Sequence, residues 1–150
     1  MKKLAITSLL ALAAVSASAI EVGVTAVGQT SLNPDRYGYG VTVGENFGGY
    51  NLTAGVSRFY RESNDQNRFS LVGSKDVYKV GPVALSGRIG YAWLDNNTGS
   101  NGSALTVGAG ASVPVTKNVT AGLSVDRQYG QTRVSSFDGN IVTAGIKVGF

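Results

Sequence analysis

The sequence predicts an all-β protein, an eight-stranded antiparallel up-and-down transmembrane β-barrel, from three observations. Apolar residues alternate with small or polar residues through eight segments, and this period of two is typical of strands with one apolar face. The links between the segments are alternately longer and shorter, and aromatic residues gather near both ends of the segments. An even strand number, short turns at one end, longer loops at the other and two aromatic bands are typical of barrels that span a membrane.

The first 19 residues have the pattern of a cleavable signal peptide. A basic Met-Lys-Lys start precedes an apolar run at residues 4–15, and Ala-Ser-Ala at residues 17–19 gives the small-residue cleavage pattern. A membrane-spanning helix needs about 20 apolar residues, so this run is too short to be one. We therefore predict a signal peptide at residues 1–19 and a transmembrane barrel at residues 20–150.

The first three predicted strands cover residues 20–29, 37–44 and 50–60 and alternate regularly. Their apolar positions are Ile20, Val22, Val24 and Ala26, then Tyr37, Tyr39, Val41 and Val43, then Leu52, Ala54 and Val56. Asn-Pro-Asp at residues 33–35 predicts a turn after the first strand, and the charged residues 61–68 predict a loop after the third.

The fourth predicted strand, residues 69–79, changes phase along its length. Phe69 and Leu71 lie on one face by a period of two, whereas Tyr78 falls on the opposite face. A β-bulge near Gly73 would reconcile the two phases, because a bulge adds one residue to one strand.

The last four predicted strands cover residues 83–93, 104–113, 119–129 and 141–150, and each alternates regularly. The final strand keeps its apolar phase up to an aromatic residue at the end of the chain. This pattern resembles the C-terminal insertion signal of bacterial outer-membrane β-barrel proteins. The residues that carry the resemblance are Ile146, Val148 and Phe150.

The aromatic residues form two predicted bands. Those near the longer loops are Tyr37, Tyr39, Phe59, Tyr60, Phe69, Tyr91, Trp93 and Tyr129. Those near the shorter turns are Phe47, Tyr50, Tyr78 and Phe150. Amphipathic rings favour the headgroup level of a bilayer, so the bands predict the two membrane surfaces.

Glycines indicate which face of the strands is the interior. Those on the polar face are Gly23, Gly38, Gly40, Gly44, Gly55, Gly90, Gly108, Gly110, Gly122, Gly145 and Gly149. Because an eight-stranded barrel is only just wide enough for side chains, we expect the Gly/Thr/Ser face inside and the Val/Leu/Ile face against lipid. The arrangement resembles the small eight-stranded outer-membrane barrels of the OmpA-domain, OmpX and opacity-like group. That resemblance implies the bacterial outer membrane as location and the barrel-assembly machinery as a partner of the C-terminal strand.

Composition excludes several kinds of chemistry. The chain has no histidine and no cysteine, which rules out His-based triads, His general bases, His metal sites and disulfides. We therefore expect no enzyme activity, no metal and no cofactor. The net charge of +4 includes Lys2 and Lys3 of the predicted signal peptide, and no run of like charges indicates nucleic-acid binding.

Four charged residues fall on the predicted inner face. Glu21 and Lys147 lie near the same end of the first and last strands, which must pair to close the barrel, so we predict an ion pair. Arg88 and Asp126, on the fifth and seventh strands, are predicted to form a second pair. We expect small residues and these pairs to fill the lumen; a small gated pore is the alternative.

Arginines gather near the strand ends that carry the longer loops. They are Arg36, Arg58, Arg61, Arg68, Arg127 and Arg133. Since guanidinium suits bidentate contact with phosphate, we hypothesise that this group binds lipopolysaccharide. Ordinary solvated loop charge is the alternative interpretation.

These observations favour a monomeric outer-membrane barrel with a structural or surface-interaction role, in adhesion or envelope integrity. Residues 95–102 and 130–140 are then the expected contacts with host or phage surfaces. A narrow porin-like channel for ions or small solutes is the alternative. A secreted soluble barrel that holds a lipid fits poorly, because the candidate interior is rich in Gly, Thr and Ser.

Overall fold

A computed structural model describes residues 20–30, 35–47, 49–60, 65–96, 101–130 and 138–150, with the side chain of residue 96 left aside. The predicted signal peptide, residues 1–19, lies outside the described residues. Eight strands are described: β1 Ile20–Thr30, β2 Arg36–Phe47, β3 Tyr50–Tyr60, β4 Gln66–Val80, β5 Val83–Asn96, β6 Asn101–Pro114, β7 Val119–Gly130 and β8 Gly139–Gly149. In the part that the structure describes, no helix is long and apolar enough to cross a membrane.

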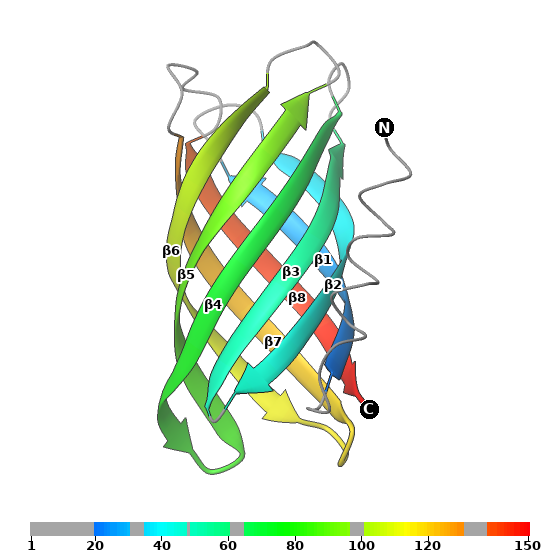
Figure 1. Cartoon of the computed structure of the whole chain (residues 1–150), viewed down its shortest axis with the longest axis vertical. Helices are drawn as coiled ribbons and strands as arrows, with labels where there is room; N and C mark the ends of the chain where they lie inside the picture. Colours follow the sequence, from blue (N-terminus) through cyan, green and yellow to red (C-terminus); the bar gives the residue numbers. More distant parts are fainter. Residues whose placement is uncertain (1–19, 31–34, 48, 61–64, 97–100, 131–137) are drawn as a thin grey trace.

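The strands form a closed antiparallel barrel in which each strand pairs with the next and β8 pairs with β1, and Figure 1 shows the strands tilted around its axis. The predicted fold class is therefore confirmed. Val22 faces Val148 across the closing pair, and the Phe150 N–H donates to the Ile20 carbonyl oxygen at 3.0 Å. Closure pairs the backbone groups between strands, as the hydrocarbon of a membrane requires.

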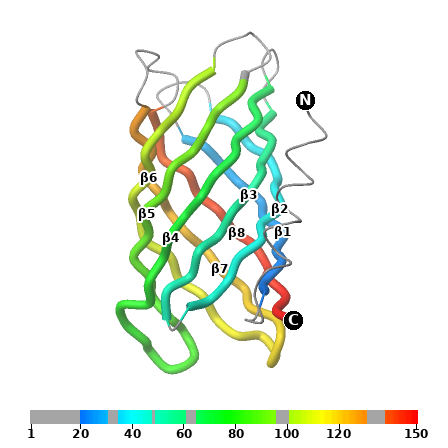
Figure 2. Tube along the Cα trace, in the orientation of Figure 1, coloured from blue at the N-terminus to red at the C-terminus, as the bar shows by residue number. Residues whose placement is uncertain are grey.

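The two ends of the barrel differ. At one end, called the turn end, residues 48–49, 81–82 and 115–118 link the strands, and β1 begins and β8 ends there. Figure 2 shows that the β4–β5 hairpin and the β6–β7 link reach furthest at this end. At the opposite end, called the loop end, β1 ends and β8 begins.

Glycine allows two of the tight turns. Among the described residues, φ is positive at Gly49 and Gly81, at +92° and +57°, a region that residues with a Cβ rarely adopt. The Gly49 N–H also donates to the Asn46 side-chain oxygen at 3.3 Å, which closes the β2–β3 turn. In the β6–β7 turn, the Thr116 hydroxyl accepts the N–H groups of Asn118 and Val119 at 3.3 and 3.1 Å.

The bulge in β4 lies closer to the turn end than predicted. Gly73 pairs regularly with Leu52 and with Ile89, whereas the register shifts between Asp76 and Tyr78. The prediction of a bulge near Gly73 is therefore wrong. Alternation locates a phase change only between the last residue in one phase and the first in the other, and the shift falls near the far limit of that interval.

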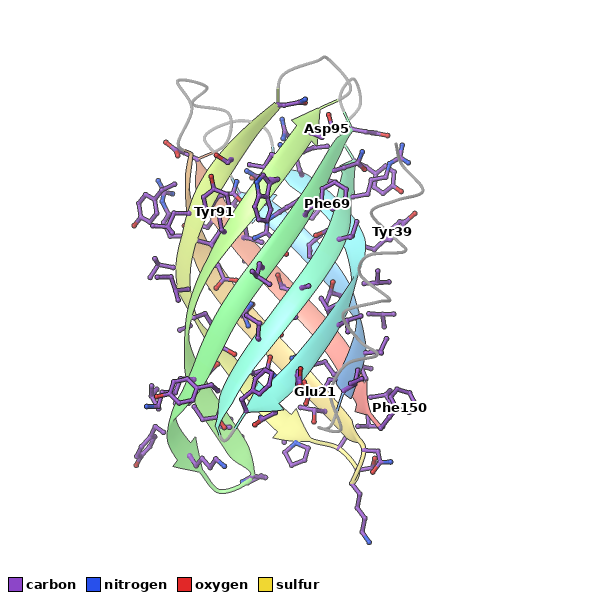
Figure 3. All side chains as sticks on the ribbon, viewed as in Figure 1. Glu21, Tyr39, Phe69, Tyr91, Asp95 and Phe150 are labelled. Atoms are coloured by element: carbon purple, nitrogen blue, oxygen red, sulfur yellow. The ribbon has the colours of Figure 1, made fainter. Side chains whose placement is uncertain are left out.

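The apolar face of the barrel points outward, as predicted. Large apolar residues such as Val24, Ile89 and Leu123 are exposed on all sides, while Thr106 and Ser124 are buried inside. A water-soluble domain does not expose so much apolar surface without a partner. Figure 3 shows the side chains of this outer face around the ribbon.

Aromatic side chains lie near both ends of the outer face. In Figure 3, Tyr39, Phe69 and Tyr91 lie toward the loop end and Phe150 toward the turn end. Phe59 is an exception to the predicted band, because it is 0 % exposed and belongs to the interior. Its phase on β3 matches Ser57 rather than Arg58, so alternation places it in the lumen.

Candidate functional site: the lumen and the loop-end arginines

The lumen is packed in its loop half. Its largest fully buried side chains are Phe59, Leu94, Ile141, Gln29, Gln66, Gln128 and Thr106, which together are called the lumen plug. They come from strands all around the barrel and lie in the half of each strand nearest the loop end. Phe59 and Ile141 also share a buried apolar cluster with Val27. The plug therefore closes the loop half of the barrel with apolar and amide side chains.

The turn half of the lumen holds a cavity of about 420 Å³. Its wall includes Thr25, Thr42, Thr53 and other hydroxyl-bearing residues, together with the charged side chains of Glu21 and Lys147. The expectation that small and paired charged residues fill the whole lumen is therefore corrected. Glu21, Lys147 and Arg88 line a polar cavity, and the closure comes from larger side chains nearer the loop end.

Glycines with little free space around them explain how large side chains fit in this narrow interior. Gly38 on β2 lies between Val27 on β1 and Phe59 on β3 in the strand register. A Cβ on Gly38 would meet the backbone of Arg58 and Phe59. The absence of a side chain at Gly38 therefore lets the neighbouring strands approach and gives Phe59 its place in the lumen.

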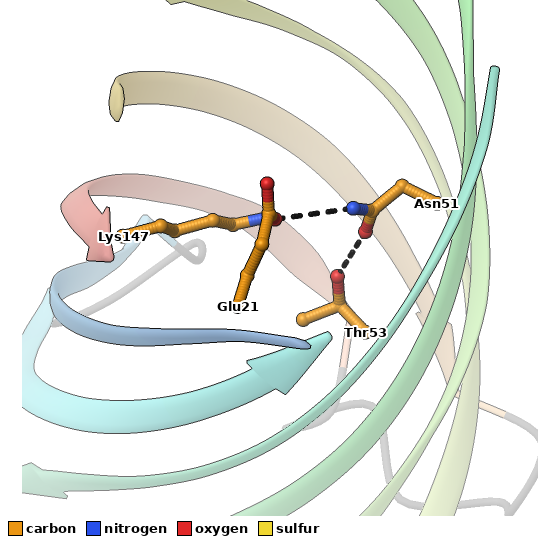
Figure 4. Close-up of polar contacts among 4 residues, drawn as sticks. All are labelled: Glu21, Asn51, Thr53 and Lys147. Atoms are coloured by element: carbon orange, nitrogen blue, oxygen red, sulfur yellow. Dashed lines mark hydrogen bonds and ion pairs between the residues drawn. The ribbon is translucent and has the colours of Figure 1, made fainter. Parts of the chain in front are cut away.

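The predicted pair at the turn end comes together in the structure. Lys147 Nζ on β8 lies 3.1 Å from Glu21 Oε2 on β1. The same carboxylate oxygen accepts a hydrogen bond from Asn51 Nδ2 on β3 at 3.2 Å, and the Thr53 hydroxyl donates to Asn51 Oδ1 at 2.6 Å, as Figure 4 shows. Gly44 on β2 lies between Glu21 and Thr53 in the register, so the contacts cross a strand that has no side chain there.

The structure also brings the second predicted pair together. Arg88 Nε on β5 lies 3.0 Å from Asp126 Oδ1 on β7. Gly108 on β6 is the register partner of both residues, so the ion pair spans a position with no side chain. The Ser124 hydroxyl donates to the other Asp126 oxygen at 3.5 Å. Asp126 is buried, while Arg88 also borders the cavity.

Two of the six predicted loop-end arginines point into the barrel. Arg36 and Arg68 are 4 % and 6 % exposed, and Arg36 Nη1 donates to Gln66 Oε1 at 2.7 Å within the lumen. The prediction that they contact lipopolysaccharide is wrong, because their guanidinium groups do not reach the outer face. Both residues lie beyond the predicted strand ends, where the alternation was not applied.

Two other arginines lie on the outer face near the loop end. The Arg58 guanidinium lies 5.5 Å from the ring centre of Tyr60 and pairs with Asp65 at 2.7 Å. The Arg127 guanidinium lies 5.7 Å from the ring centre of Tyr129, and its Nη1 donates to Asn140 at 3.5 Å. Each cation is therefore held against an aromatic side chain of the loop-end band. The remaining two, Arg61 and Arg133, lie outside the described residues.

The residues of the C-terminal pattern lie on the lipid-facing side. Ile146, Val148 and Phe150 are all exposed on the outer face. β8 pairs with β7 on one edge and with β1 on the other, so both edges of the strand that carries this pattern are covered once the barrel has formed.

A closed eight-stranded barrel with an apolar outer face, aromatic residues at both ends and a polar cavity inside defines a small outer-membrane β-barrel protein. In this class the short turns face the periplasm and the longer loops face the cell exterior. Residues 1–140 match the family model described as YfaZ precursor, and the chain belongs to the YfaZ family. The word precursor in that description agrees with the predicted signal peptide.

Solved structures of other small barrels share the fold. Neisserial surface protein A is similar with a TM-score of 0.61 and 16 % identity, over 90 % of this chain and 98 % of that one. The Yersinia pestis outer-membrane protein Ail in a nanodisc is similar with a TM-score of 0.59 and 12 % identity, over 89 % and 99 %. Ail in complex with the heparin analogue sucrose octasulfate gives 0.51 and 17 %, over 89 % and 97 %. No curated protein matches the chain significantly.

Proposed function

We propose that this protein is a closed, non-catalytic surface barrel that acts through its outer face and loop end, in adhesion or envelope integrity. The lumen plug carries this proposal, because a barrel closed in its loop half offers solutes no continuous path. The lack of histidine supports a non-catalytic role, and Glu21 and Asp126 are each paired with a basic side chain.

Single-channel recording in planar bilayers tests the closed lumen against the porin-like alternative. We expect the wild-type barrel to give no stable conductance steps. Replacing Phe59, Leu94 and Ile141 together by alanine should produce steps, because the cavity would then extend toward the loop end. Stable steps in the wild type that change in Glu21→Ala would instead identify a narrow channel along the cavity.

For the outer face, we propose that Arg58 and Arg127 bind phosphate groups of lipopolysaccharide. Both lie near the loop end, and each guanidinium keeps N–H donors beyond those used by Asp65 or Asn140. Stacking on Tyr60 and Tyr129 orients them and reduces the entropy lost on binding. The sulfated sugar in the Ail complex has related anionic chemistry, which supports an acidic saccharide as the ligand class.

A double variant, Arg58→Gln with Arg127→Gln, tests this site. We expect lipopolysaccharide binding to weaken about tenfold, or about 1.4 kcal/mol, because two charged donors to phosphate are lost. The matched control is Lys75→Gln with Lys79→Gln, which removes two charges at the turn end; Lys75 Nζ lies 4.6 Å from the Tyr50 ring centre in a comparable arrangement. Equal weakening in both variants would show nonspecific attraction, and no weakening in either would remove the proposed site.

Two further contacts belong to this proposal. The C-terminal strand, with Ile146, Val148 and Phe150, is proposed as the contact with the barrel-assembly machinery before closure. Host or phage surfaces are proposed to contact residues 95–102 and 130–140; of these, residues 97–100 and 131–137 lie outside the described residues.

A further inference from the structure

Beside the lumen plug, the loop half of the lumen holds a cation, Arg68, with no counter-charge of its own. Arg68 on β4 is 6 % exposed, its Nε has no hydrogen-bond partner, and the described residues offer it no ion pair. A guanidinium stays protonated in proteins, so the charge cannot be removed by titration. A buried charge without an ion pair is strongly unfavourable. The Arg68 guanidinium therefore needs a negative charge close to it.

Other buried donors near Arg68 also lack partners. Gln66 lies two residues before Arg68 on the same face of β4, and its Nε2 has no partner. Gln66 Oε1 accepts a hydrogen bond from Arg36, and Arg36 is the register partner of Gln29. Gln29 is 1 % exposed, and neither atom of its amide has a partner. Three buried side chains with unused N–H groups, those of Arg68, Gln66 and Gln29, are thus connected by register and hydrogen bonding in one region of the lumen.

The acidic group that acts on Arg68 is already engaged. Asp126 attracts the Arg68 charge electrostatically. However, one Asp126 oxygen pairs with Arg88 at 3.0 Å and the other accepts the Ser124 hydroxyl at 3.5 Å. Arg88 also repels the Arg68 charge. Buried water could satisfy an amide, but water does not neutralise a guanidinium.

We propose that the lumen plug binds a small inorganic anion of the chloride class, held by the Arg68 guanidinium and the side-chain amides of Gln29 and Gln66. The anion balances the Arg68 charge and accepts the unused N–H groups. It therefore stabilises the plug from inside the barrel. This site differs from the proposed lipopolysaccharide site, which lies on the outer face and depends on Arg58 and Arg127.

Bromide is the probe, because it replaces chloride and scatters anomalously. Crystals of the full barrel soaked in sodium bromide should show an anomalous peak within hydrogen-bond distance of Arg68. In parallel, the temperature at which the folded band disappears on gels should be measured in sodium gluconate and in sodium bromide at equal ionic strength. Gluconate is too large to enter the plug, whereas bromide can fill the site. Because the ionic strength is equal, the two salts screen the protein's charges to the same extent, and a difference between them reports binding of bromide. We expect bromide to raise this temperature by about 4 °C.

Variants separate the site from general salt effects. Arg68→Gln should lose the bromide-dependent rise, whereas Lys117→Gln, which removes one charge from an exposed turn, should keep it. Arg68→Lys retains a charge and should keep part of the rise, which provides a readout if Arg68→Gln does not fold. The absence of an anomalous peak, or an equal rise in Arg68→Gln and wild type, would overturn the proposal.

Discussion

Replacing Gly38 by alanine is expected to lower the free energy of unfolding by about 3 kcal/mol, because overpacking a close-packed interior is costly. The new Cβ would meet backbone atoms of Arg58 and Phe59, which cannot move aside as a flexible side chain can. Strands β2 and β3 would have to separate where Phe59 enters the plug. Urea unfolding in lipid vesicles, followed by the mobility of the folded band on gels, would measure the loss.

Gly122 provides the matched control, since it also lies in a strand and lines the lumen. The atom closest to a Cβ there would be the Ala111 carbonyl oxygen at 3.6 Å, an ordinary contact. Gly122→Ala should therefore be neutral or stabilise the barrel by about 0.5 kcal/mol through the unfolded state. Equal destabilisation by both variants would contradict the close approach of strands at Gly38 as the cause.

Removing the Asp126 carboxylate with Asp126→Ala is the second change with a large expected effect, about 3 kcal/mol of destabilisation. Arg88 would lose its ion-pair partner, and Arg68 would lose the negative charge that attracts it. Arg88 and Arg68 would then remain in the lumen without that negative charge. The same urea titration measures the effect.

Two comparisons isolate the cause of that loss. Glu21→Gln, at the more exposed pair with Lys147, should cost about 1 kcal/mol, because solvent screens charges that are partly exposed. Adding Arg88→Leu to Asp126→Ala should restore part of the stability, since it removes the unpaired charge. A cost for Asp126→Ala no larger than for Glu21→Gln would show that Asp126 is not needed to compensate the lumen charge.

Alternation in the sequence was enough to predict the strands and their inner and outer faces. It placed Glu21 and Lys147 on the same face of the two closing strands, and Arg88 and Asp126 on the same face two strands apart. It also identified the lumen glycines as small residues needed inside. It did not show that Gly108 and Gly44 lie between charged or polar partners, because this depends on the register between strands.

The wrong predictions have two sources. Either the period of two was not continued beyond a predicted strand end, or residue type was preferred to the phase of the strand. Arg36 and Arg68 precede the predicted starts of their strands, although continuing the period of two would have placed both in the lumen. The prediction that Phe59 belongs to a membrane band follows its residue type, whereas its phase on β3 directs it into the lumen. The plug follows from continuing the same period through Gln29, Gln66 and Ile141. The cavity cannot be predicted this way, since it depends on side-chain packing across the whole lumen.

Quenching of Trp93 fluorescence by brominated lipids is the most direct test of the barrel's sidedness. Trp93 is the one tryptophan of the chain, is 51 % exposed on the outer face, and belongs to the loop-end aromatic band. In vesicles, bromines placed just below the headgroups should quench its emission strongly, and bromines near the bilayer centre should quench it less. Emission unaffected by brominated lipids at any depth would contradict an apolar face that contacts lipid.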